Sequence, residues 1–164
     1  MTLSMKVTVE RARKKDIPRL EEIYSGEGLH RSIDRGRWYV HSHFDYNHIL
    51  VAKVEGRIQG ACFWRIEGEK YCGAGWIEDM WVEEGFRRRG LAEALLRKAL
   101  VDIKEDFERD CLVLRKVFLT TQAPNKAARS LYEKVGFVRC GEVDDMYVDG
   151  VLTLIYGIPM RGRR

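Results

Sequence analysis

The sequence predicts a mixed α/β (α+β) fold built on a central, mostly antiparallel sheet. Short segments with the pattern of strands recur along the chain and follow one another through tight turns, which favours antiparallel pairing. The longest helical pattern, from Leu91 to Phe107, separates strand-like segments at Trp76 and Leu112, and such a crossover would let those two strands lie parallel. At 164 residues the chain is expected to form a single domain, residues 1–164.

The chain up to Gly28 is expected to hold one strand and one helix. The segment Lys6–Glu10 reads KVTVE and alternates as a short, half-buried strand does. Asp16 stands before an Ile-Pro pair, which is typical of an N-cap followed by proline in the first helical turn. The helix is expected to end at Gly26 and Gly28.

The segment from His30 to His48 permits two interpretations. Three histidines and two aspartates could form a metal cluster, although no complete zinc spacing is present: His41, His43, His48, Asp34 and Asp45. The alternative is a second amphipathic helix or lid, with histidines at its rim and three aromatic side chains turned inward: Trp38, Tyr39 and Phe44. We favour the second interpretation and expect no metal site.

Strands dominate from Ile49 onward. HILVAKV and IQGACFWRI are expected to pair as a hairpin around the turn Glu55–Arg57, and GWIEDMWV follows as the next strand. After the long helix comes the strand CLVLRKVFLTT. A short helix, KAARSLYEKV, then opens after Pro124-Asn125 and stops at Gly136.

A closing hairpin is expected from Phe137–Tyr147 and Val151–Ile158. Its turn is placed at residues 148–150, because Asp-Gly is a strong turn signal. Three aspartates in this hairpin give a weak indication of a cationic ligand, and the alternative is an ordinary charged turn: Asp144, Asp145 and Asp149.

Composition and charge exclude several classes of protein. No segment approaches the ~18 consecutive apolar residues that cross a bilayer, and the N-terminus lacks the apolar run of a secretion signal. We therefore expect no membrane association and a cytoplasmic location. The net charge of +4 arises from 29 basic and 25 acidic residues, which does not fit a nucleic-acid-binding surface. The scattered cysteines are expected to be reduced and buried: Cys62, Cys72, Cys111 and Cys140.

The segment from Trp76 to Ala99 carries the strongest functional signal. A strand is expected from Trp76 to Val82, and a basic turn ending in Arg-Arg-Arg-Gly leads to a helix that begins near Leu91. Unpaired N–H groups and the helix dipole make such a junction an anion site, and glycine permits close backbone approach. A phosphate or pyrophosphate group is expected to bind at Arg87–Ala92. A solvated basic turn is the alternative.

Two motifs follow one another along the chain. Residues 87–92, RRRGLA, fit the pattern Q/R-x-x-G-x-G/A, and residues 125–137 fit N-x6-Y-x3-G-F. Together these motifs resemble the acetyl-CoA-dependent N-acetyltransferases of the GNAT family over roughly residues 76–137. The resemblance implies a GNAT-type sheet flanked by about four helices, with acetyl-CoA as co-substrate.

The resemblance also implies roles for single residues. The backbone of Met80–Val82 would hydrogen-bond the pantetheine arm, and an N–H on this strand would polarise the thioester carbonyl. Tyr132 would be the general acid that protonates the departing CoA thiolate. Contacts with acetyl-CoA are expected from Met80, Trp81, Val82, Arg87, Arg88, Arg89, Gly90, Leu91, Ala92, Glu93, Asn125 and Tyr132.

The base that takes the proton of the amine is expected to be a carboxylate on the strand before the basic turn. Strand alternation places Glu78 and Asp79 on opposite faces, so only one of them is expected to reach the cleft. The run IEDMWV is similar to the L-E-D-φ-φ-V strand of polyamine acetyltransferases in the family, which favours Glu78, with water as a further alternative. Ribosomal-protein N-terminal acetyltransferases have a glutamate where this chain has Thr120, which argues against that subgroup.

The predicted reaction is acetyl transfer from acetyl-CoA to a primary amine by direct attack. The acceptor could be a polyamine, another small amine, or a lysine or N-terminus of a protein, and a homodimer is possible. A non-catalytic acetyl-CoA sensor or interaction module is the alternative function. No nucleic acid is expected as a partner.

Overall fold

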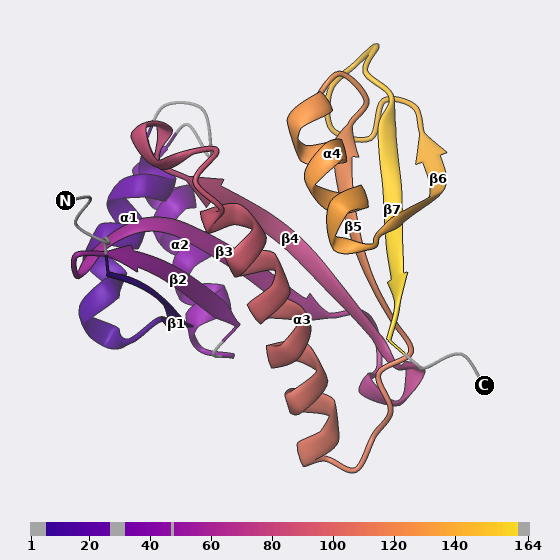
Figure 1. Ribbon diagram of the computed structural model, residues 1–164, viewed down its shortest axis with the longest axis horizontal. Helices are drawn as coiled ribbons and strands as arrows, with labels where there is room; N and C mark the ends of the chain where they lie inside the picture. Colours follow the sequence, from indigo (N-terminus) through magenta and orange to yellow (C-terminus); the bar gives the residue numbers. More distant parts are fainter. Residues whose placement is uncertain (1–5, 27–31, 47, 161–164) are drawn as a thin grey trace, which may run out of the picture.

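The computed structural model describes residues 6–26, 32–46 and 48–160, and they form a seven-stranded sheet with helices on both faces (Figure 1). The strand order is β1-β2-β3-β4-β5-β7-β6, and β4–β5 is the parallel pair among antiparallel neighbours. The strands are β1 (Val7–Arg11), β2 (Ile49–Val54), β3 (Arg57–Ile66), β4 (Ala74–Val82), β5 (Lys116–Gln122), β6 (Val138–Val143) and β7 (Thr153–Pro159). The helices are α1 (Ile17–Ser25), α2 (Ile33–Phe44), α3 (Leu91–Arg109) and α4 (Lys126–Val135). The predicted sheet and its parallel crossover are confirmed.

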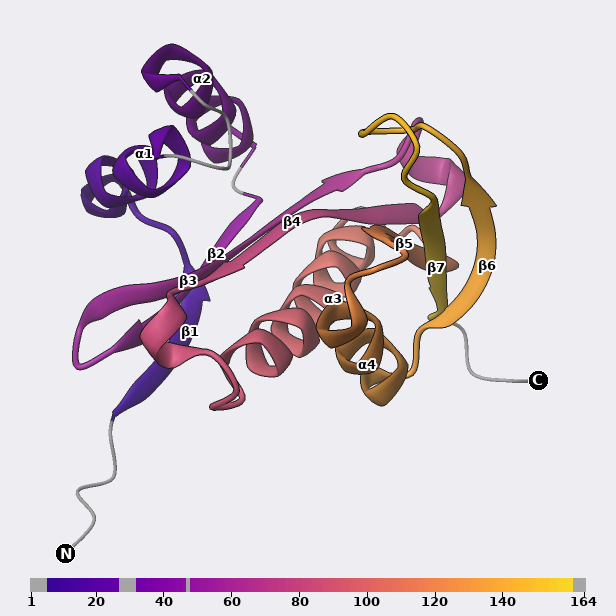
Figure 2. The same cartoon turned by 90° about the horizontal axis from the view of Figure 1, so that it is seen from above.

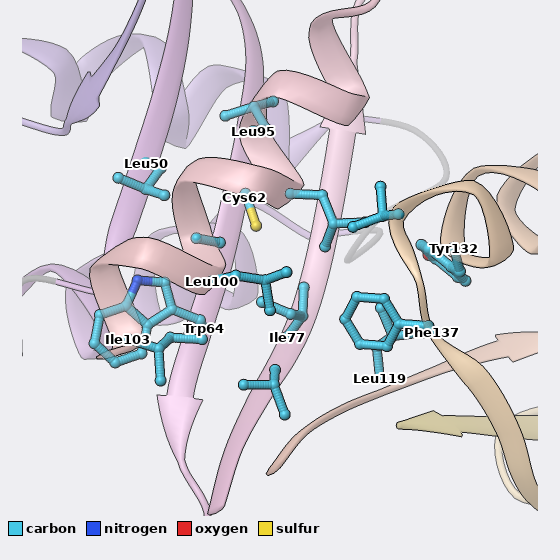
Figure 3. Close-up of a cluster of buried hydrophobic side chains, with 14 of the residues drawn as sticks. Leu50, Cys62, Trp64, Ile77, Leu95, Leu100, Ile103, Leu119, Tyr132 and Phe137 are labelled. Carbon is cyan, nitrogen blue, oxygen red and sulfur yellow. The ribbon is translucent and has the colours of Figure 1, made fainter. Parts of the chain in front are cut away.

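The helices cover the two faces of the sheet in pairs. Figure 2 shows α1 and α2 above strands β1–β4, with α3 and α4 below. Successive residues of β3 alternate between these faces, because Phe63 packs under α1 and α2 whereas Cys62 and Trp64 pack against α3. Figure 3 shows the larger cluster, in which Leu95 and Ile103 of α3 lie against the sheet. Each face of the sheet therefore has its own apolar core.

Strands β4 and β5 pair over only part of their length. The ladder joins Ala74–Ile77 to Lys116–Leu119 and goes no further, although β4 continues to Val82 and β5 to Gln122. Beyond these pairs the two strands diverge, as Figure 1 shows. The divergence leaves the C-terminal end of β4 without β5 as a neighbour in the middle of the sheet.

A β-bulge lies on β4 where the two strands separate. On β3, Trp64 is opposite Ile77 and the adjacent Phe63 is opposite Asp79, so Glu78 is the extra residue of the bulge. Ile77 and Met80 consequently belong to the α3 side of the sheet, whereas Trp81 packs on the α1–α2 side. The bulge changes the face to which the following side chains point.

Helix α2 packs tightly on α1 through Gly36. A Cβ atom at this glycine would lie 2.5 Å from Oγ and 2.7 Å from the backbone nitrogen of Ser25. These distances are shorter than any ordinary contact, so the hydrogen of glycine lets the two helices approach. The position of α2 over β3 and β4 depends on this contact.

Several local predictions were wrong. Asp16 precedes α1 but makes no side-chain cap; its carboxylate accepts a hydrogen bond from the Arg13 N–H (2.9 Å) and pairs with the buried Lys53 (2.9 Å). Strand β5 begins at Lys116 rather than in the preceding Cys-Leu-Val-Leu run. The predicted turn at residues 148–150 does form, with the Val151 N–H donating to the Val148 carbonyl oxygen (3.1 Å), but it does not join the two strands directly, because β6 ends at Val143 and β7 begins at Thr153.

Side-chain burial also departs from the predictions at two places. Trp38 is 71% exposed, while Tyr39 and Phe44 do pack against the core. Of the four cysteines Cys62 is buried, and the other three are exposed on a short helix, a loop and the edge strand β6: Cys72, Cys111 and Cys140. Within the described ranges, no helix is both long and apolar enough to cross a membrane.

We expect Gly36→Ala to destabilise the protein. The clash with α1 should cost about 1–3 kcal/mol, and the gain in helix propensity, about 1 kcal/mol, offsets only part of it. The free energy of unfolding in urea should fall by about 1 kcal/mol. Gly85→Ala is the matched control, since nothing lies within 4 Å of the Cβ position there. Equal stability of the two variants would contradict the tight contact.

Candidate functional site

A groove of about 600 Å³ opens where β4 leaves β5, and we call it the α3–α4 groove. It lies between the end of β4, the basic turn, the first turn of α3 and one face of α4. The residues that line it are Met80, Trp81, Val82, Phe86, Arg87, Arg88, Gly90, Ala92, Glu93, Asn125, Ala127, Ala128, Leu131 and Lys134. The structure thus brings together nine of the twelve residues that were expected to contact acetyl-CoA.

The basic turn approaches α3 in a conformation that depends on Gly90. This glycine precedes the helix with a φ of 84°, in the left-handed region, and Arg88 also has a positive φ of 59°. The Arg87 Nε donates a hydrogen bond to the Val82 carbonyl (3.0 Å), which ties the turn to the end of β4. Gly90, Ala92 and Glu93 line the groove, so the first turn of α3, whose N–H groups have no partner within the helix, borders it as an anion site requires.

Three of the predicted contact residues do not line the groove. Leu91 is 5% exposed and belongs to the apolar core beneath α3. The Arg89 guanidinium lies over the Phe86 ring at 5.4 Å. Tyr132 is buried between α4 and the sheet, where its ring packs against Phe137 and Tyr156. These positions leave Leu91 only its backbone for a ligand contact.

Tyr132 is held as a neutral phenol. Burial raises its pKa above the ordinary tyrosine value, and the nearby Cys62 and Asp79 raise it further. Figure 3 shows Tyr132 beside Phe137 at the α4 end of the larger apolar cluster. A phenol that stays protonated at neutral pH can donate a proton but cannot act as a base.

Glu93 and Lys134 connect α3 to α4 at the wall of the groove. The Lys134 ammonium lies 2.6 Å from the Glu93 carboxylate, and Arg97 contacts the same carboxylate at 3.0 Å. These hydrogen bonds lower the pKa of Glu93. The sequence analysis did not assign Lys134 to the site. It follows Ala127 by seven residues and Leu131 by three, so all three lie on the face of α4 that lines the groove, and this spacing could have revealed it.

Asn125 has a structural role and also lines the groove. Its Oδ1 accepts a hydrogen bond from the Ala128 N–H (3.1 Å), so the side chain caps the N-terminus of α4. The cap fixes the face of α4 that the groove exposes. One conformation of Asn125 is therefore compatible with both expected roles, the cap of α4 and a contact with acetyl-CoA.

Glu78 faces the opposite side of the sheet, in a hollow of about 330 Å³ that we call the α2 hollow. The hollow is lined by Trp38, Tyr39, Ser42, His43, Tyr46, His48, Arg65 and Glu78. The two oxygens of the Glu78 carboxylate contact His43 and Arg65. Burial acts to raise the pKa of Glu78, but the contacts with His43 and Arg65 outweigh it, and the pKa lies below its ordinary value.

The expectation that Glu78 and Asp79 point to opposite faces is wrong. Asp79 influences Tyr24 of α1 and Tyr39 of α2: burial raises the pKa of both tyrosines, and the Asp79 charge raises it further. Both carboxylates are therefore on the α1–α2 side, because the bulge at Glu78 interrupts the alternation. Asp79 also accepts a hydrogen bond from the Met80 N–H (2.7 Å).

In the α2 hollow, the sequence analysis missed the roles of His43 and Arg65. The histidines were expected at the rim of α2, yet the His43 side chain is only 12% exposed, and its ring packs on Tyr39 and Phe63. The i, i+4 spacing of Tyr39 and His43 is the signal that could have placed both on the inner face. Among the described residues, no cluster of three or more His, Cys, Asp or Glu could hold a metal ion.

We expect Gly90→Ala to weaken acetyl-CoA binding. Alanine at a φ of 84° costs about 1–2 kcal/mol, so the turn should relax and the dissociation constant measured by calorimetry should rise about 5- to 30-fold. Gly150→Ala is the matched control, because Gly150 has a φ of 72° and equally open space but lies outside the groove. A similar loss of affinity in both variants would refute a role for the turn in binding.

Comparison with known proteins agrees with this geometry. Residues 11–137 match the family model of the acetyltransferase (GNAT) family. N-alpha-acetyltransferase 30 of Xenopus laevis is 33% identical in an alignment of length 107 that covers 57% of this chain and 37% of the frog protein. An N-alpha-acetyltransferase of Sulfurisphaera tokodaii is 27% identical in an alignment of length 119 that covers 68% of each chain. The chain thus spans about a third of the vertebrate relative.

Solved structures have the same fold at low sequence identity. Ard1 from Thermoplasma volcanium superposes with a TM-score of 0.76 at 20% identity, over 95% of this chain and 99% of that one. A chain of the NatC complex bound to Gag peptide and CoA gives a TM-score of 0.75 at 17% identity, over 96% and 100%. With the family model matched from the last residue of β1 to just beyond α4, this chain belongs to the GNAT family of acetyltransferases.

Proposed function

We propose that this chain transfers the acetyl group of acetyl-CoA to the α-amino group at the N-terminus of a peptide or protein. The observation that carries the proposal is the similarity to N-alpha-acetyltransferases over 52–68% of the chain. The arrangement of the two hollows supports it. The α3–α4 groove and the α2 hollow are on opposite faces of β4, on either side of the place where β4 leaves β5.

In the proposed reaction the donor enters from one face and the acceptor from the other. Acetyl-CoA lies in the α3–α4 groove, with its pyrophosphate at the basic turn and its pantetheine arm along Met80–Val82. The acceptor amine comes from the α2 side, where Glu78 is the candidate base. The Met80 N–H now donates to Asp79 (2.7 Å), so this bond has to break before the same N–H can polarise the thioester carbonyl.

The charge state of Glu78 favours an N-terminal amine over a lysine or a polyamine. A carboxylate whose pKa is lowered by His43 and Arg65 is a weak base. At pH 7.5 roughly a third of α-amino groups with a pKa of about 7.8 are already neutral, against roughly one in a thousand lysine amines with a pKa of about 10.4. The α-amine therefore makes a much smaller demand on the base.

Small amines are the second candidate acceptors. The strand sequence IEDMWV, with its similarity to polyamine acetyltransferases, favours them. Thr120 is also compatible with this reading: its hydroxyl lies 3.4 Å from the Tyr147 hydroxyl and supplies no carboxylate. A non-catalytic acetyl-CoA sensor is less consistent with a chain that keeps both Tyr132 and Glu78.

An acceptor comparison tests the proposed function. One peptide has a free N-terminus and no lysine; its partner has the same sequence with an acetylated N-terminus and one added lysine; spermidine is the third acceptor. We expect CoA release with the first peptide only, with a rate that levels off above about pH 8, where the α-amine is neutral. Release with only the lysine peptide or spermidine would refute the proposal.

Tyr132→Phe tests the proposed general acid. Removal of the hydroxyl should lower kcat about 10- to 100-fold and leave the dissociation constant of acetyl-CoA nearly unchanged, because the ring and its packing are kept. Since the pKa of Tyr132 is raised, its phenol stays protonated to at least about pH 10. The wild-type rate should therefore show no alkaline loss below that pH. Unchanged turnover in the variant would exclude the role.

A further inference from the structure

His43 has a fixed position in the α2 hollow. Its ring centroid lies 4.5 Å from that of Tyr39 and 5.2 Å from that of Phe63, and the side chain is 12% exposed. The ring thus fills the space between α2 and β3 and presents its Nε2 edge to Glu78 on β4. This contact joins residues that are 35 positions apart in the chain.

Both ring nitrogens of His43 face oxygen acceptors. Nδ1 lies 3.0 Å from the Tyr39 carbonyl oxygen, and Nε2 contacts Oε2 of the Glu78 carboxylate. The Ser42 hydroxyl is 3.3 Å from Nδ1 but only 2.9 Å from the same Tyr39 carbonyl, to which it donates. A neutral imidazole carries a single N–H. In His43 this is the Nδ1–H, which donates its hydrogen bond to the Tyr39 carbonyl oxygen. In that tautomer Nε2 is unprotonated, so one proton can bind between Nε2 and Oε2.

Arg65 determines where that proton is held. Its Nε contacts the other oxygen of Glu78, Oε1, while its guanidinium stacks 5.6 Å from the Trp76 ring. A guanidinium cannot be deprotonated in a protein, so this contact favours the carboxylate form of Glu78. Without a proton on Nε2, a lone pair and a carboxylate oxygen face each other, which is unfavourable. The pair therefore attracts one proton as a unit.

We propose that His43 is a positioning residue that makes the His43–Glu78 pair, rather than Glu78 alone, the acceptor of the proton leaving the substrate amine. The proposal rests on the proposed function of the site. Glu78 is a weak base when the ring beside it already carries the extra proton; beside a neutral ring, the Nε2 lone pair of His43 stabilises the proton that Glu78 takes up. Glu78 remains the group that touches the amine.

The proton transfers balance in the following way. The acceptor arrives as R–NH₃⁺; one N–H bond breaks, and its proton moves to Oε2 of Glu78, where it is shared with Nε2 of His43. The electron pair left on nitrogen forms the C–N bond to the acetyl carbon, and the C–S bond breaks. The sulfur takes a proton from Tyr132, which is restored by the second proton of the amine. The pair then releases its proton to solvent, and the products are the amide, the CoA thiol and one proton.

Other ionisable groups surround the pair: Tyr24 on α1, Tyr39 on α2, His48 before β2, Arg65 on β3 and Asp79 on β4. For three of them, His48 and the two tyrosines, burial moves the pKa away from neutrality. Burial lowers the pKa of His48 to about 4, so this ring is neutral at the pH of the assay. Burial also raises the pKa of both tyrosines far above neutrality, and Asp79 contributes to the increase.

The kinetic test compares His43→Gln with His41→Gln in the full chain. Glutamine at position 43 can donate to Glu78 but cannot take up a proton. We expect kcat/KM for the N-terminal peptide to fall about 10- to 100-fold at pH 6.5 and less than about 3-fold at pH 9, where the amine is already neutral. His41 lies on the same helix, is 51% exposed and pairs with Glu21 at 2.9 Å, so His41→Gln should match the wild type throughout. A loss that is equal at every pH would mean a purely structural role and would overturn the proposal.

A second measurement needs no substrate. The imidazole nitrogens are followed by NMR as a function of pH, and the signal missing from His43→Gln identifies the ring. A carboxylate beside an imidazolium stabilises it, so Glu78→Gln should move the titration midpoint of this ring to lower pH. An unmoved midpoint would show that no proton is shared and would overturn the proposal, even if His43→Gln failed to fold. A wild-type chain that acetylates no peptide but shows this shift would refute the proposed function and leave the pair intact.

Discussion

The incomplete pairing of β4 with β5 is the constraint on which the rest of the structure depends. The parallel ladder holds four residue pairs and ends at Ile77 and Leu119. Backbone N–H and C=O groups beyond that point would each cost about 1–3 kcal/mol if they were buried without partners. The sheet therefore has to open here to solvent or to a ligand. The groove between α3 and α4, the bulge at Glu78 and the hollow beneath α2 all lie at this opening.

Basic side chains hold the carboxylates around the opening. Glu93 is held by Lys134 and Arg97 at the wall of the groove, and Glu78 is held by His43 and Arg65 on the other face. Each carboxylate stays ionised without presenting an unbalanced negative charge. Under the proposed function, the groove then favours an anionic ligand at the N-terminus of α3, while the hollow keeps a basic oxygen close to the incoming amine. The two faces of one strand thus provide different electrostatic environments.

Local sequence signals predicted the elements of the fold well, and contacts between distant elements explain most of the failures. The glycine turn before α3 and the Asn–Tyr spacing of α4 are encoded within a few residues, so the groove could be predicted. The bulge at Glu78 could not be predicted. It reverses the alternation of side chains along β4, but it exists only because of the register in which β4 pairs with β3. The contact of His43 with Glu78 depends on how α2 packs on α1. Gly36 is the close contact in that packing, but its role is visible only in the folded structure and not in the sequence.

Cys62 has a chemical consequence for an enzyme that handles thioesters. It is opposite Met80 in the β3–β4 ladder and points to the α3 side of the sheet, directly behind a wall of the groove. A thiolate at that depth could capture an acetyl group by transthioesterification and leave the protein self-acylated. Burial raises the pKa of the Cys62 thiol, and the charges of Asp79 and Asp102 raise it further. The thiol therefore stays protonated and weakly nucleophilic. The same apolar core that stabilises the fold thus protects the donor from a competing nucleophile.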